Sequence, residues 1–89
     1  MISKSIIVKG KVQGVFFRAS AKRAAEDLNL NGWVKNLPDG NVEILISGDK
    51  PQIEEFIKWC HAGPENARVK EIIVNDSNEI HSNSFKIIH

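Results

Sequence analysis

The sequence has few of the residues that mark several common classes of protein. It contains one cysteine, Cys60, so neither an intrachain disulfide nor a metal cluster built on cysteines can form. An excess of one charge is also missing, because 12 basic and 11 acidic residues leave a formal net charge of +1. Both signs are spread along the chain, which favours neither a nucleic acid nor a membrane surface as a partner.

Long hydrophobic runs are missing as well. No apolar stretch approaches the roughly 20 residues of a membrane span, and Met1 leads directly into a strand-like segment, so we expect no signal peptide. The histidines His61, His81 and His89 lack the spacing of metal ligands, and we expect no metal and no cofactor. These absences favour a cytoplasmic monomer with one domain, residues 1–89.

What is present is a regular alternation of strand and helix patterns. Strands are predicted at residues 5–12, 32–37, 41–48, 68–74 and 84–89, with a tight turn at 37–40. Helices are predicted at residues 17–28 and between an N-cap at Asp49 and the pair Gly63–Pro64. The order β-α-β-β-α-β with a tail strand is typical of an α+β, ferredoxin-like split βαβ sandwich. We expect two helices on one face of an antiparallel sheet, with the other face in water.

Apolar spacing within these elements predicts the core. Ile6, Val8 and Val12 share one face of the first strand, and Gly10 near its end is typical of a bulge or a close backbone approach. The second helix carries an apolar stripe that includes Cys60, which we therefore interpret as a core residue and not as a nucleophile. Trp59 flanks the same stripe and is predicted to pack there.

The most informative stretch is residues 10–18, GKVQGVFFR, which joins the first strand to the first helix. A glycine-containing turn at a helix start exposes backbone N–H groups that, with the helix dipole, favour an anion such as phosphate. Arg18 falls at this helix start, where a cation opposes the dipole. It either grips a bound oxyanion through its planar guanidinium or is a solvated surface arginine, and the local pattern leaves both interpretations open.

The sequence offers no Ser-His-Asp arrangement and no convergent carboxylates. An enzyme built from it would act on substrates that need only positioning and charge stabilisation, as an acyl phosphate does, because its leaving group is already a carboxylate. A neutral amide can aim the water, and Asn36 is the best placed one if residues 33–36 lie beside the loop. The alternative is a turn-flanking asparagine bonded to its own backbone.

Two motifs of this chain are similar to signatures of the acylphosphatase family. Residues 10–18 resemble G-x-V-Q-G-V-x-F-R, and residues 32–42, GWVKNLPDGNV, resemble G-[FYW]-V-x-N-x-x-x-G-x-V. Gly63–Pro64 and the segment 85–87 also resemble the family, so the likeness spans nearly the whole chain. Two long motifs in the right order are far more specific than either one.

The resemblance implies an enzyme that hydrolyses small acyl phosphates to a carboxylate and inorganic phosphate, without a cofactor. It implies that Arg18 binds the phosphate, that Asn36 orients the attacking water, and that the backbone of five loop residues helps to hold the phosphate: Gln13, Gly14, Val15, Phe16 and Phe17. Ala21 and Leu37 depart from the family, which often has threonine at both positions, and this puts catalytic efficiency in doubt.

Two other functions are compatible with the predicted fold. An RNA-recognition domain has the same element order but needs aromatic side chains on its open strands, and the first and third strands here offer no such pair. A non-catalytic module that binds phosphate or an acyl phosphate for regulation would keep the loop without turnover. No residue near the loop indicates which acyl group is accepted.

Overall fold

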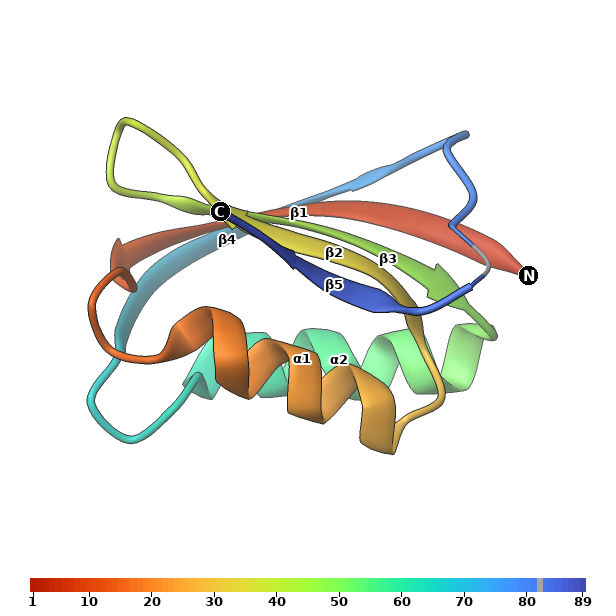
Figure 1. Cartoon of the computed structure of the whole chain (residues 1–89), viewed down its shortest axis with the longest axis horizontal. Helices are drawn as coiled ribbons and strands as arrows, with labels where there is room; N and C mark the ends of the chain where they lie inside the picture. Colours follow the sequence, from red (N-terminus) through yellow and green to blue (C-terminus); the bar gives the residue numbers. More distant parts are fainter. Residues whose placement is uncertain (82) are drawn as a thin grey trace.

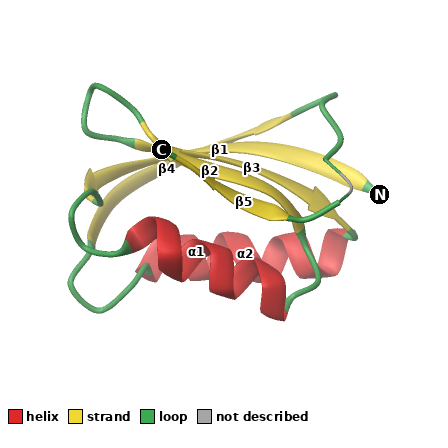
Figure 2. Ribbon diagram, in the orientation of Figure 1, coloured by secondary structure: helices red, strands yellow, loops and turns green. Residues whose placement is uncertain are grey.

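The computed structural model describes residues 1–81 and 83–89, and the chain folds in the predicted order (Figure 1). The strands are β1 (Ile2–Lys11), β2 (Asn31–Asn36), β3 (Val42–Gly48), β4 (Arg68–Asp76) and β5 (Phe85–Ile88), and the helices are α1 (Phe17–Asp27) and α2 (Lys50–Ala62). Both helices lie on the same face of the sheet (Figure 2). The predicted α+β, ferredoxin-like fold is confirmed, with element ends shifted by up to three residues.

The sheet has the order β4-β1-β3-β2-β5, and one edge differs from the prediction. β1 pairs antiparallel with β3 and β4, and β2 pairs antiparallel with β3, but β5 runs parallel to β2. The expectation of a wholly antiparallel sheet is therefore wrong. The reason is the path of the chain: β4 ends opposite Lys4 and β5 begins opposite Gly32, both at the end of the sheet where β2 starts. The connection crosses this end without turning back along the sheet.

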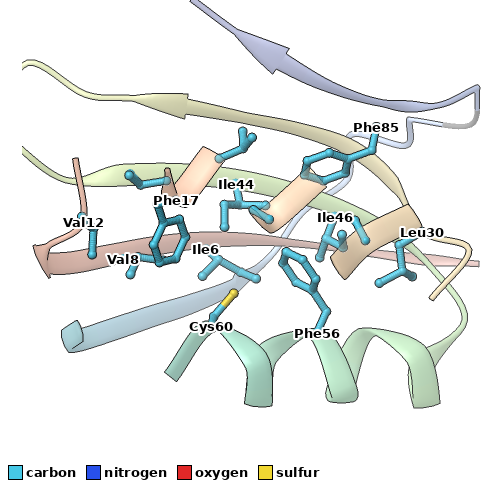
Figure 3. Close-up of a cluster of buried hydrophobic side chains, with 14 of the residues drawn as sticks. Ile6, Val8, Val12, Phe17, Leu30, Ile44, Ile46, Phe56, Cys60 and Phe85 are labelled. Atoms are coloured by element: carbon cyan, nitrogen blue, oxygen red, sulfur yellow. The ribbon is translucent and has the colours of Figure 1, made fainter. Parts of the chain in front are cut away.

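The core fills the space between the sheet and the helices (Figure 3). Ile6, Val8 and Val12 are each at most 1% exposed, which confirms the predicted inner face of the first strand. Phe17 of α1 packs against Trp59 of α2 with ring centroids 5.3 Å apart. Burying a side chain such as Phe17 stabilises the fold by about 2–3 kcal/mol, so this contact fixes the start of α1 firmly.

The opposite face of the sheet is less open than predicted. The Ser47 side chain is fully buried, and its Oγ lies 2.6 Å from Oγ of Ser3. The backbone N–H of His81 donates to the same Ser47 oxygen at 3.1 Å, so the β4–β5 connection covers this end of the sheet. The expectation that the whole face meets water is wrong here. The alternation of apolar and polar residues along a strand cannot show where a polar connection packs over the sheet.

The N-terminus of α2 matches the prediction only in part. Asp49 is its N-cap, as predicted, but its side chain makes no capping hydrogen bond. Gln52 stands three residues after Asp49, which is the spacing of a capping box, but its Oε1 is buried without a hydrogen-bond partner among the described residues. The start of this helix therefore depends on packing and on Pro51 in its first turn.

Cys60 lies in the core, and burial raises the pKa of its thiol from 9.0 to about 12. Above pH 9 the thiol ionises in the unfolded chain but stays protonated in the native one. The native state then binds more protons, so stability falls as pH rises, by up to about 1.4 kcal/mol per pH unit for this group. Between pH 8 and 10.5, the free energy of unfolding measured in urea should fall more steeply with pH for the wild type than for Cys60→Ala. Equal slopes of this free energy against pH would contradict the prediction.

Candidate active site

A bulge at the end of β1 aims the chain into the loop. The register with β4 shifts between Lys9 and Gly10, as the sequence predicts. Gly10 has a φ of 128°, and a Cβ there would lie 2.1 Å from the carbonyl oxygen of Arg68. No other residue type fits this close approach without moving the neighbouring strand. The loop therefore leaves β1 in a fixed direction.

In the loop, two residues with a left-handed backbone stand on either side of one buried residue. Gly14 has a φ of 74° and Phe16 a φ of 63°, whereas Val15 between them is only 7% exposed. Successive residues of this kind turn their N–H groups towards one side, which forms an anion-binding concavity. A Cβ added to Gly14 would meet nothing within 4 Å, so space is open above the loop.

The N–H groups of this concavity have no backbone partners. Within residues 1–81 and 83–89, no backbone carbonyl accepts from the N–H groups of residues 14–19, and Ser20 N–H is the first to donate, to Phe16 O at 3.0 Å. The first turn of α1 also contains no acidic residue. The positive end of the helix dipole is therefore left for an anion from outside the helix.

Arg18 is the second residue of α1, as the sequence predicts, and its side chain is half-buried. Its Nη1 donates to the carbonyl oxygen of Ile88 on β5 at a long 3.5 Å. In the part of the chain that the structure describes, Arg18 forms no ion pair. The guanidinium thus keeps most of its hydrogen-bonding capacity for a ligand.

A cavity of about 320 Å³ brings the predicted site residues together. The loop, the turn after β2 and the end of β5 lie at the same end of the molecule (left in Figure 1). The cavity is lined by Gly14, Phe16, Phe17, Arg18, Ala19, Asn36, Ile87 and His89. The predicted proximity of Asn36 to the loop is confirmed. Gln13 and Val15 are not among the lining residues.

Asn36 ends β2, where it pairs with Val42 of β3. Its Oδ1 is buried and has no hydrogen-bond partner among the described residues. An amide bonded to its own backbone, the alternative left open by the sequence, is therefore not what the structure shows. A buried polar atom without a partner costs about 1–3 kcal/mol, and such an atom at a cavity wall is best explained by a ligand or water that satisfies it.

Gln13 uses its side chain to hold the loop against the β2–β3 turn. Its Nε2 donates to the carbonyl oxygens of Leu37 and Asn41, both at 2.8 Å. The loop that carries the free N–H groups is thereby tied to the residue next to Asn36. The side-chain donor Nε2 of Gln13 is therefore already engaged within the protein and is not offered to a phosphate.

Replacing Gln13 with methionine is expected to lower the free energy of unfolding by about 1–3 kcal/mol, because two hydrogen bonds of about 0.5–1.5 kcal/mol each are lost, although both carbonyls keep a backbone donor. Enzymatic activity should fall as well, since the loop and Asn36 are no longer held in register. Gln52→Met is the matched control, because Gln52 Oε1 has no partner to lose. Urea unfolding of both variants measures the difference, and equal stabilities would show that the tether contributes nothing.

Sequence reasoning missed part of the cavity wall. Ile87 and His89 reach the cavity because β5 pairs with β2, and the Phe16 side chain reaches it because its backbone is left-handed. No motif marks either feature. The described residues contain no group of three or more His, Cys, Asp or Glu side chains that could hold a metal. None of the described helices is both long and apolar enough to span a membrane.

The described residues form a small α+β domain in which N–H groups without backbone partners, an arginine and an amide lie around one cavity. The family model for acylphosphatases matches residues 4–87. The acylphosphatase of Marinobacter nauticus is 49% identical over 71 residues, which cover 80% of this chain and 77% of the relative. That of Alkalilimnicola ehrlichii is 44% identical over 86 residues, or 97% of both chains.

A solved structure gives the same result. The crystal structure of acylphosphatase from Bacillus subtilis superposes with a TM-score of 0.95 at 37% identity and covers all of both chains. The chain therefore belongs to the acylphosphatase family. It is an enzyme that hydrolyses acyl phosphates, and the family resemblance identified from the two motifs is confirmed.

Proposed function

We propose that the 13–18 loop and Arg18 bind the phosphate of a small acyl phosphate and that Asn36 orients the water that attacks it. The observation that carries this proposal is the shared cavity. It places unpaired N–H groups, an arginine without an ion pair in the described residues, and the unsatisfied amide of Asn36 around one space. Each group offers the hydrogen bonds that a phosphate and its attacking water need.

The chemistry requires no general acid. The bond between phosphorus and the carboxylate oxygen breaks, a bond from the water oxygen to phosphorus forms, and one water proton passes to the phosphate. The negative charge on the equatorial phosphate oxygens is stabilised by Arg18 and the loop N–H groups. Asn36, held at the end of β2, keeps the water in line.

Two departures from the family pattern bear on efficiency. Ala21 is fully buried in α1 and Leu37 follows Asn36, and neither carries the hydroxyl that the family often has there. The unpartnered Oδ1 of Asn36 fits the absence of a hydroxyl that would steady the amide. We propose that the Asn36 amide is held less rigidly than in relatives with threonine, which lowers kcat and leaves the reaction type unchanged.

The direct test is release of phosphate from benzoyl phosphate and acetyl phosphate by purified protein. We expect turnover without added metal, an unchanged rate with EDTA, and competitive inhibition by inorganic phosphate. Inhibition by EDTA would overturn the metal-free mechanism. Phosphate binding without turnover would instead favour the regulatory module that the sequence left as an alternative, and the family relationship favours the enzyme.

We further propose that the protein works as a cytoplasmic monomer of one domain without a nucleic-acid or membrane partner. The near balance of 12 basic and 11 acidic residues supports the absence of a nucleic-acid or membrane partner. Light scattering coupled to gel filtration should give the 10.0 kDa mass of the single chain, and a dimer mass would correct the proposal.

A further inference from the structure

The cavity of the active site has an apolar wall to which no role has yet been assigned. Its lining includes the apolar side chains of Phe16 and Ile87 as well as the polar side chains of Arg18 and Asn36. An acyl phosphate likewise has two ends, a charged phosphate and an acyl group. Once the phosphate occupies the loop, the acyl group must extend along whatever remains of the wall.

Phe16 has an exposure and a backbone conformation that are unusual for a phenylalanine. It is 80% exposed, whereas the neighbouring Phe17 is 1% exposed in the core. Its φ of 63° lies in the left-handed region, which costs a residue with a Cβ about 1–2 kcal/mol. Glycine or asparagine would relieve this strain, so stability does not explain a phenylalanine here. Strain of this kind gathers at functional sites.

Ile87 supplies the second apolar surface. It lies on β5 opposite Val34 of β2, two residues before Asn36. The side chain is half-buried against the core, so it is held rigidly and still reaches the cavity. The cavity volume of about 320 Å³ is at the lower end of small-molecule sites, which begin at about 300 Å³. A cavity of this volume suits a small acyl group in contact with Phe16 and Ile87.

We propose that Phe16 and Ile87 form an acyl-group subsite that selects acyl phosphates with a compact apolar group, aromatic ones above all. Phe16 is the specificity-determining residue, because its ring is free to stack on the acyl group. The proposal rests on the proposed binding of phosphate by the loop and Arg18. It adds a substrate preference that no motif in the chain indicates.

The test compares kcat/KM for benzoyl phosphate and acetyl phosphate in Phe16→Asn. Asparagine accepts a left-handed backbone, so the variant should fold. Loss of one stacking contact is expected to lower the ratio of benzoyl to acetyl kcat/KM by about 2- to 10-fold. Because Phe16 belongs to the proposed phosphate-binding loop, kcat/KM for acetyl phosphate and the inhibition constant for inorganic phosphate are measured in the same variant, and the prediction concerns only the ratio of the two substrates. Phe16→Leu should retain part of the preference.

Ile80→Asn is the matched control, because Ile80 is 50% exposed beside Met1 and Ile2, in a different depression of the surface. Its ratio should equal that of the wild type. An unchanged ratio in Phe16→Asn overturns the subsite. A parallel loss for both substrates with weaker phosphate inhibition also overturns it, because Phe16 would then only shape the loop. If the wild type is not inhibited by phosphate at all, the proposed loop function fails instead.

Discussion

Replacing Arg18 with alanine is expected to lower kcat/KM for benzoyl phosphate by about 1,000-fold, the upper range for loss of one oxyanion donor. The reason is that the guanidinium combines full charge with a planar pair of donors. It is half-buried, so its field is screened less than that of a surface arginine. In the proposed site Arg18 also contacts the phosphate of the ground state, so the inhibition constant for inorganic phosphate should rise by at least about tenfold, the effect of one lost charge-assisted hydrogen bond.

Two further variants make the Arg18 prediction specific. Arg18→Lys keeps the charge but loses the planar fork, so its activity should fall between those of wild type and Arg18→Ala. Arg23→Ala removes an exposed arginine from the same helix that does not line the cavity, and it should behave as wild type. Comparable losses in Arg18→Ala and Arg23→Ala would mean that net charge, and not a local contact, drives phosphate binding.

Local patterns predicted the elements that carry the site. Apolar spacing placed Ile6, Val8 and Val12 inward, and the predicted start of the first helix at residue 17 placed Arg18 in its first turn. The order of elements then predicted that Asn36 lies near the loop. Such information is local in sequence, because it depends on periodicities of 2 and 3.6 residues and on glycine turns.

What the sequence could not predict depends on contacts between distant segments. The pairing of β5 with β2 follows the path of the β4–β5 connection, and a four-residue strand carries no signal for its neighbour. The same limit hid the tether from Gln13 to Leu37 and Asn41. The left-handed backbone of Phe16 was missed for a different reason, because such a backbone is normally marked by glycine or asparagine and here it is not.

Replacing Asn36 with alanine is expected to separate catalysis from binding and from stability. If Asn36 contacts only the water, kcat should fall by about 100- to 1,000-fold, as for loss of one positioned polar group in a transition state. The inhibition constant for inorganic phosphate should stay within about twofold, less than 0.5 kcal/mol. Rates of phosphate release and phosphate inhibition measure both, and Asn31→Ala at the other end of β2 is the matched control.

The same substitution should change stability little, in contrast to Gln13→Met. Asn36 Oδ1 accepts no hydrogen bond from the described residues, so replacing the amide breaks no such bond within this part of the protein. The urea midpoint of Asn36→Ala should therefore stay close to that of wild type, although activity is lost. A large loss of stability would show that the amide is structural, because a polar side chain kept for function is expected to contribute little to the stability of the fold.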